Sequence, residues 1–202
     1  MLHTIPEVPR LRVPAIVPAV GGALTTSQRA GFRVVHLSIQ HNHLHLIVEA
    51  DGDAERRTGM QYLTTVLARA INATTARRGS VFEQRYHATP MVNPTQTRNT
   101  LAYVLCNWRH HDEDRACAAA CAATFDPYAS ALRFDGWTYA PTGFDPRFPV
   151  AAPRTWLLRD GWKLVGRVDP LQRPGDSAAC SSRSMSMASP SSRAGSVSST
   201  IR

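Results

Sequence analysis

Residues 32–50 read FRVVHLSIQHNHLHLIVEA, and this stretch decides the fold. Its first part, Phe32–Gln40, is rich in β-branched and aromatic residues, which favours a β-strand. The pair His41-Asn42 suits a tight turn, and His43–Ala50 has the composition of a second strand. We therefore predict two antiparallel strands joined by a short turn.

A long amphipathic helix is predicted downstream, over Ala54–Arg78. Asp53 is a suitable N-cap for this helix, and Gly79 is placed to end it. Apolar residues three or four positions apart would form its buried stripe: Met60, Leu63, Leu67, Ala70 and Ile71.

Two further elements follow this helix. Val81–Val92 is predicted to be mostly strand. A second helix is predicted from Pro94 to about His111, because a proline is tolerated in the first helical turn. The middle of the chain therefore has the order strand, strand, helix, strand, helix.

The N-terminal segment is difficult to assign. Its apolar content suits a helix, but Pro14, Pro18 and the pair Gly21-Gly22 would break or fray one. An upstream helix preceded by a first strand would complete a ferredoxin-like βαββαβ sandwich with an antiparallel sheet, of the α+β class. We find no clear first strand in MLHTIPEVPRL.

The composition changes twice after the second helix. We divide the chain into a poorly defined segment (1–30), a core (31–111), an irregular extension packed on that core (112–171) and a tail (172–202). The tail is rich in Ser and Arg and has too few large apolar residues to order itself, so we expect it to be disordered.

The charge of the chain favours a nucleic acid partner. The formal net charge is +8, and nearly all of the cations are arginines, since Lys163 is the only lysine. Arginine binds phosphate bidentately and stacks on bases, although a coding bias towards arginine would leave the same composition without any ligand. The four cysteines show no disulfide-like spacing, and no apolar run reaches the length of a membrane span. We therefore expect a cytoplasmic protein without a membrane partner.

His43 and His45 are the first candidate site residues. Side chains alternate along a strand, so both imidazoles would point to the same face, where they could share one divalent metal ion. Two histidines on a polar sheet face would show the same pattern without binding a metal.

Tyr103 and Asn107 are the second pair, in the sequence LAYVLCNWRHH. They lie four residues apart on a predicted helix and therefore share one of its faces. A tyrosine one turn from a metal ligand suits a nucleophile for phosphoryl transfer. A packed tyrosine beside a capping asparagine is the alternative interpretation.

The motifs together resemble the REP-associated tyrosine transposases, which are single-tyrosine members of the HUH endonuclease superfamily. The resemblance consists of HNHLHLIVE, then RYHATP about 40 residues later, then YVLxN, in this order, and it covers about Phe32 to His111. PRTWLLRDGW is similar to C-terminal sequence in some relatives.

This resemblance implies a ferredoxin-like fold and cleavage of single-stranded DNA, often beside imperfect hairpins, by a monomer or homodimer. It implies that Tyr103 is the nucleophile, forming a 5′-phosphotyrosine link and releasing a 3′-hydroxyl. It also implies that Mg²⁺ or Mn²⁺ is held by His43, His45 and Asn107.

Five arginines are candidate phosphate contacts, and each has a solvated surface charge as its alternative: Arg77, Arg78, Arg85, Arg98 and Arg109. His87 could lie near the site, although a structural role suits it better.

Two competing functions remain open from the sequence. One is a catalytically silent or decayed protein of the same fold that binds single-stranded nucleic acid. The other is a hydrolase that activates water with a metal, for which we find no acidic cluster, although Glu49 shares the strand face of the two histidines.

Overall fold

The middle layer of the protein is a three-stranded antiparallel sheet in the order β1-β3-β2, seen in a computed structural model that describes residues 1–83, 86–143 and 145–174. Its strands are β1 (Leu2–His3), β2 (Phe32–Ile39) and β3 (His43–Ala50). The two strands predicted from the sequence are confirmed, and they pair in the antiparallel sense. The mixed helix and sheet composition agrees with the predicted α+β class.

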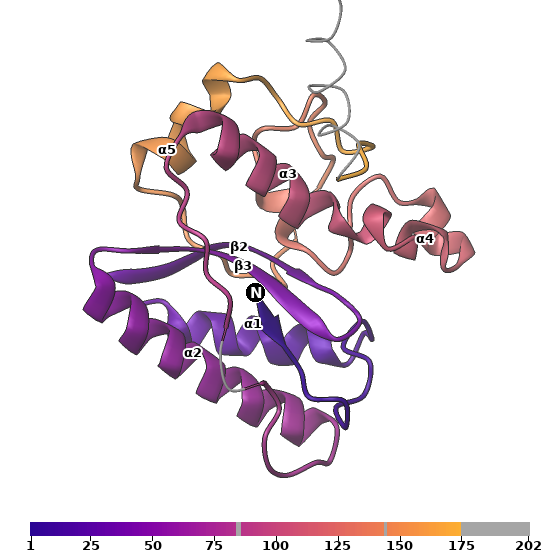
Figure 1. Cartoon of the computed structure of the whole chain (residues 1–202). Helices are drawn as coiled ribbons and strands as arrows, with labels where there is room; N and C mark the ends of the chain where they lie inside the picture. Colours follow the sequence, from indigo (N-terminus) through magenta and orange to yellow (C-terminus); the bar gives the residue numbers. More distant parts are fainter. Residues whose placement is uncertain (84–85, 144, 175–202) are drawn as a thin grey trace, which may run out of the picture.

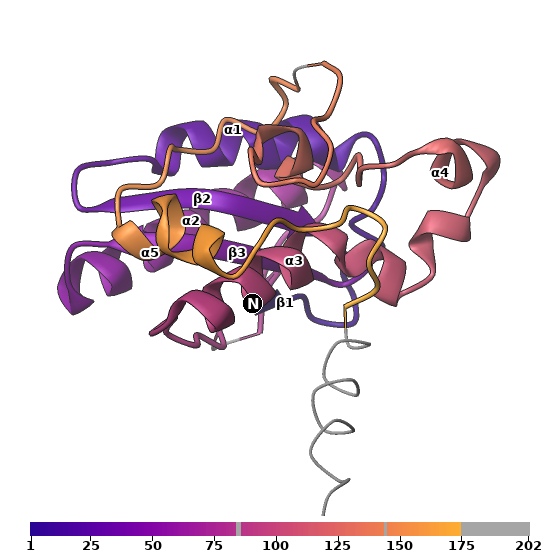
Figure 2. The same cartoon turned by 90° about the horizontal axis from the view of Figure 1, so that it is seen from above.

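Helices cover both faces of this sheet (Figure 1). Helices α1 (Ile16–Ser27) and α2 (Asp53–Thr74) lie together on one face, and α3 (Pro94–His110) lies on the other. Figure 2 shows the C-terminal extension running over the α3 side of the sheet. In its described residues, this extension contains two short α-helices and three 3₁₀ turns: α4 (Ala118–Ala122), α5 (Trp156–Arg159), η1 (Glu113–Arg115), η2 (Ser130–Arg133) and η3 (Gly161–Leu164).

The N-terminal segment is better ordered than the sequence suggested. Strand β1 exists, so the expectation that a first strand is missing was wrong. Helix α1 forms despite Pro18, because this proline lies in the first turn, where its missing N–H has no intrahelical partner to lose. Gly21 fits because a Cβ there would lie 2.2 Å from the carbonyl oxygen of Arg147, so only glycine lets this backbone approach the helix.

The ends of α2 differ from the prediction. Gly52, not Asp53, is the N-cap, and Asp53 instead forms an ion pair of 2.9 Å with Arg56 in the first turn. The helix ends at Thr74, and Gly79 follows it with a positive φ of 92° in the turn. The predicted C-terminal stop at Gly79 was therefore wrong by about one helical turn.

The segment expected to be a strand over 81–92 includes residues 84–85, which lie outside the described residues, and its described part is mostly irregular. It lies beside β1, where Phe82 forms a single bridge with Thr4. On either side of that bridge, Ile5 N–H donates to the carbonyl of Val81 at 3.0 Å, and Glu83 N–H donates to the carbonyl of His3 at 2.9 Å.

Strand β3 separates two hydrophobic cores. Leu44 is fully buried in the first core, which lies between the sheet and helices α1 and α2. Ile47 is buried in the second core, which lies between the sheet, α3 and the C-terminal extension and includes Trp108 and Trp162. Successive side chains of a strand point to opposite faces, so the even positions of β3 face the first core and the odd positions face α3.

Glu49 anchors the C-terminal extension to the sheet. Its carboxylate accepts hydrogen bonds from the backbone N–H of Arg154 at 2.9 Å and from the hydroxyl of Thr155 at 2.6 Å, and it lies 3.3 Å from Arg33. Burial opposes ionisation, but these bonds and the arginine together lower the pKa of Glu49. Since Glu49 is fully occupied in this role, it is not free to act as the metal ligand considered from the sequence.

Two helical glycines give a stability test. A Cβ on Gly59 of α2 would lie 2.2 Å from the ring of Phe32, whereas a Cβ on Gly22 of α1 would meet nothing within 4 Å. Gly59→Ala should therefore destabilise the protein by about 1–3 kcal/mol through overpacking. Gly22→Ala should stabilise it by about 0.5–1 kcal/mol through helix propensity. Urea unfolding of both variants measures this, and equal shifts would contradict the packing of α2 on β2.

Candidate active site

The four residues selected from the sequence meet between β3 and α3. The Nε2 atoms of His43 and His45 are 3.0 Å apart, and Asn107 Nδ2 lies 3.0 Å from His45 Nε2. The ring of Tyr103 packs edge-on against His45, with 5.1 Å between the ring centroids. The predicted orientation of both histidines towards one face is confirmed. The chemical roles of the four residues stay predictions.

Helix α3 presents its two site residues at different depths. The sequence forms this helix with Pro94 in the first turn and Asn93 as the N-cap, whose side chain accepts a hydrogen bond from the N–H of Gln96 at 2.8 Å. Asn107 is completely buried, whereas Tyr103, one turn earlier, is 40% exposed. The tyrosine therefore stands at the mouth of the site, within reach of a large substrate, and the asparagine lies at its base.

Both imidazoles are held in the neutral form. Burial, with further repulsion from His3 and His111, lowers the pKa of His43 to about 4. Burial and repulsion from His43 lower the pKa of His45 to about 3. Each ring is therefore uncharged near neutral pH and has one nitrogen with a free lone pair.

Asn42 fixes which nitrogen of His43 carries that lone pair. The Nδ1 atom of His43 lies 3.0 Å from Asn42 Oδ1, which is an acceptor, so Nδ1 carries the proton in this assignment. Nε2 is then unprotonated and points towards His45. This is the tautomer that a metal ligand needs.

The donor set fits a divalent ion in two respects. The Oδ1 atom of Asn107 is buried without a hydrogen-bond partner. Rotation of the Asn107 amide about its Cβ–Cγ bond would turn this oxygen towards His45 in place of Nδ2. In addition, the 3.0 Å between the two imidazole nitrogens matches neighbouring ligands of an octahedral ion with bonds of about 2.1 Å.

The set has no acidic member. Within the described ranges, no group of three or more His, Cys, Asp or Glu side chains is arranged so that it could hold a metal ion. An ion at this position would therefore be bound by two imidazoles and one amide.

Two further histidines beside the site were missed in the sequence. The ring centroids of His3 and His111 lie 5.0 Å and 5.9 Å from that of His43. His3 belongs to β1, whose pairing with β3 places it directly opposite His43. No pattern in the sequence signalled the position of His3, because a strand of two residues has no periodicity to detect.

The predicted phosphate contacts have different surroundings. Arg78 is exposed, and Arg77 is half-buried. Arg98 donates hydrogen bonds to the carbonyl of Arg167 in the C-terminal extension at 2.9 Å and to Oε1 of Gln172, the first residue of the predicted tail, at 3.1 Å. Arg85 lies outside the described residues, as does the tail from residue 175 onwards.

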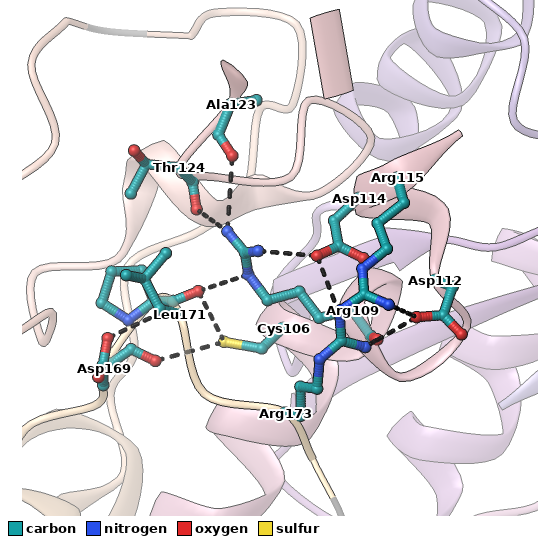
Figure 3. A network of polar contacts seen from close by, with 11 residues as sticks. Cys106, Arg109, Asp112, Asp114, Arg115, Ala123, Thr124, Asp169, Leu171 and Arg173 are labelled. Atoms are coloured by element: carbon teal, nitrogen blue, oxygen red, sulfur yellow. Dashed lines mark hydrogen bonds and ion pairs between the residues drawn. The ribbon is translucent and has the colours of Figure 1, made fainter. Parts of the chain in front are cut away.

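The prediction that Arg109 contacts phosphate was wrong, because its side chain is buried and bonded to other groups of the protein (Figure 3). Its guanidinium donates to the carbonyl of Pro170 at 2.9 Å, to Asp114 Oδ2 at 3.0 Å and to the carbonyl of Thr124 at 3.0 Å. These bonds join α3 to two parts of the C-terminal extension. Arg109 is thus a structural anchor and not a surface contact for phosphate.

Comparison with known proteins identifies no relative: no protein-family model, no curated protein and no solved structure matches this chain. Within the described part of the chain, no helix has the length and apolar character required to cross a membrane. The functional interpretation therefore depends on the geometry of the site and on the sequence motifs.

The role of Arg109 can be tested by stability. Arg109→Ala would leave Asp114 partly unpaired in a buried position, and it should destabilise the protein by about 3 kcal/mol. The matched control Arg78→Ala, on an exposed side chain, should change stability by less than about 0.5 kcal/mol. Urea unfolding of the two variants measures this. Indistinguishable midpoints would show that Arg109 is not an anchor.

Proposed function

We propose that this protein is a metal-dependent endonuclease of the transposase type, which cleaves and rejoins single-stranded DNA with Tyr103 as its nucleophile. The observation that carries the proposal is the convergence of an exposed tyrosine, two neutral imidazoles and a buried amide, supplied by β3 and α3. The motifs that contain these residues are the ones that resemble REP-associated tyrosine transposases.

The proposed reaction is a transesterification. The phenol oxygen of Tyr103 attacks the scissile phosphorus, a new O–P bond forms, and the bond from phosphorus to the 3′ oxygen breaks. The phenol loses its proton, and the departing strand takes one up as a 3′-hydroxyl. Attack by a 3′-hydroxyl on the phosphotyrosine reverses the reaction and joins strands without an external energy source.

His43, His45 and Asn107 are the proposed ligands of Mg²⁺ or Mn²⁺, which would polarise the scissile phosphate. Burial keeps the two imidazoles neutral, and the chain positions all three groups next to the tyrosine. Tyr103 is held by α3 so that its ring packs against His45 while the residue remains 40% exposed.

The proposal includes a ferredoxin-like arrangement of the core. The backbone bonds of residues 81–83 run along the edge of β1 that faces away from β3. Counting this segment as a rudimentary fourth strand gives the chain order βαββαβ and the spatial order 4-1-3-2. Both α1 and α2 then cover one face, which leaves the other face for α3 and the site.

Single-stranded DNA, in hairpin-forming repeats, is the proposed substrate. The net charge of +8 supports a polyanionic partner, and exposed Arg78 is available to contact phosphate. The proposal assigns no such contact to Arg109.

Tyr103→Phe tests the nucleophile. This change removes only the phenol oxygen and keeps the ring that packs on His45, so folding and DNA binding should be preserved. Wild-type protein with Mn²⁺ and labelled single-stranded hairpin DNA should give a detergent-resistant protein band that retains the label on the 3′ side of the cut. Tyr103→Phe should reduce that band at least about 1000-fold.

Tyr139→Phe is the matched control, since Tyr139 is exposed to a similar degree (45%) and lies outside the site. It should form the covalent band at the wild-type rate. A persistent band in Tyr103→Phe would assign the nucleophile to another residue. A wild-type protein that binds every hairpin tested but never forms the band would instead be a silent nucleic-acid-binding protein.

His45→Ala tests the metal ligands. Loss of a central imidazole should weaken Mn²⁺ binding at least about tenfold, measured by titration calorimetry in the absence of DNA. His41→Ala is the control, because His41 is exposed on the turn before β3 and is not part of the ligand set. Equal Mn²⁺ affinity in the two variants would contradict the assigned ligands.

A further inference from the structure

A slot of about 280 Å³ lies directly beside Tyr103 and His45, and the proposed reaction does not account for it. Helix α2 supplies Met60 to its lining, helix α3 supplies Thr100 and Tyr103, and the segment between these helices supplies residues 86–89 and 91. Residues His45–Val48 of β3 and Met1 also line it. The slot is therefore lined both by the candidate nucleophile and by residues of a strand.

This part of β3 is an open strand edge. The pairing of β1 with β3 stops at Leu2 and Leu44, so β1 does not pair with the rest of that edge. Met1 lies at the slot beside it and donates its N-terminal ammonium to the carbonyl of His87 at 2.7 Å. Leu37, opposite Leu46 on β2, donates its N–H to Ser130 Oγ at 3.1 Å, on the side away from β3. Leu37 and Leu46 are therefore a non-hydrogen-bonded pair, and the N–H and C=O of Leu46 also point away from β2, towards the slot.

The walls combine apolar and polar groups. Met60 is a buried side chain, and Thr100 is half-buried. At the α2 wall, the Arg56 guanidinium donates to the hydroxyl of Tyr86 at 3.2 Å, which holds an aromatic ring at the slot. A planar ligand with hydrogen-bonding edges suits such a lining, since it can lie against the aromatic and thioether groups and pair with a strand backbone.

We infer that this slot binds one unpaired nucleobase of the DNA strand, next to the phosphate that Tyr103 attacks, and so determines which base stands at the cut. The inference rests on the proposed function. The backbone N–H and C=O of Leu46 offer one donor and one acceptor to the base edge, and bases held in protein pockets are read in this way. The nucleotide on the other side of that phosphate would remain outside the slot.

The size of the slot favours a base over a peptide. The three residues of β3 whose backbone lines the slot, Leu46–Val48, span only about 10 Å, which is short for the pairing of an added strand. The slot is also closed on one side by residues 86–91, and both Tyr103 and His45 line it. A single base held here stays attached to a phosphate at the nucleophile, whereas a peptide would have no relation to Tyr103.

Thr100→Trp tests the inference by filling the slot from α3 without altering the site residues. The control is Asn99→Trp, at an exposed neighbouring position of the same helix that does not line the slot. The probe is a dT10 oligonucleotide in which one central base is varied among the four, with binding measured by fluorescence anisotropy. Wild-type protein and Asn99→Trp should prefer one central base by about tenfold, and Thr100→Trp should bind all four within about twofold.

Photo-crosslinking locates the base independently. With 5-iodouracil at the central position, the major crosslink should map to residues 86–91 or to Met60 in wild-type protein and disappear in Thr100→Trp. Equal affinity of wild-type protein for all four bases, or crosslinks only outside the slot, would overturn the inference. A peptide ligand is the alternative, and an extended decapeptide of alternating Thr and Val is the probe for it. If Thr100→Trp kept its base preference but lost binding of this peptide, the slot would be a peptide site, and the inference would be wrong.

These readouts separate the inference from the proposed function, because neither requires a covalent phosphotyrosine. Base preference without cleavage would support the slot and contradict the catalytic proposal. Cleavage that is indifferent to the base and unaffected by Thr100→Trp would support the catalytic proposal and contradict the slot.

Discussion

The alternation of side chains along β3 is the constraint on which the rest of the structure depends. Leu44 enters the core under α1 and α2, while His43, His45 and Ile47 face α3. If the pairing register of β3 shifted by one residue, both imidazoles would point into an apolar core and Leu44 would point towards the site. Burying two unpaired imidazoles and losing a fully buried leucine would be strongly unfavourable, so the same apolar residues that stabilise the sheet also fix the position of the histidines.

Helix α3 has to be held against this face, and the C-terminal extension holds it. Trp108 on the helix packs in the second core with Trp137 and Trp162 of the extension, and Arg109 bonds to the carbonyl of Pro170 on the same extension. Asn107, immediately before these two residues, is thereby kept at His45. The extension consequently supports the site without supplying any of its four candidate residues.

The sequence predicted the parts of this arrangement that are encoded locally. The period of β3 and the helical spacing from Tyr103 to Asn107 each follow from a few neighbouring residues, and both were found as expected. Strand β1 could not be predicted in this way, because two residues carry no period and their conformation depends on partners in β3 and at residues 81–83. The burial of Arg109 was equally hidden, since its acceptor at Pro170 lies 61 residues away in the chain. An arginine in an amphipathic helix resembles a surface charge until the segment that covers it is known.

The neutrality of the ligand set has a consequence for how the proposed site would work. Two imidazoles and one amide bring no negative charge, and burial keeps the imidazoles from becoming cations themselves. Within the described residues no acidic group joins them, so the charge of a divalent ion would be balanced mainly by the phosphate of the bound strand. The ion and the DNA would then each increase the affinity of the site for the other, because linkage between two ligands is reciprocal. The proposed site would therefore bind the ion measurably but weakly by itself, and more tightly once a strand lies across Tyr103.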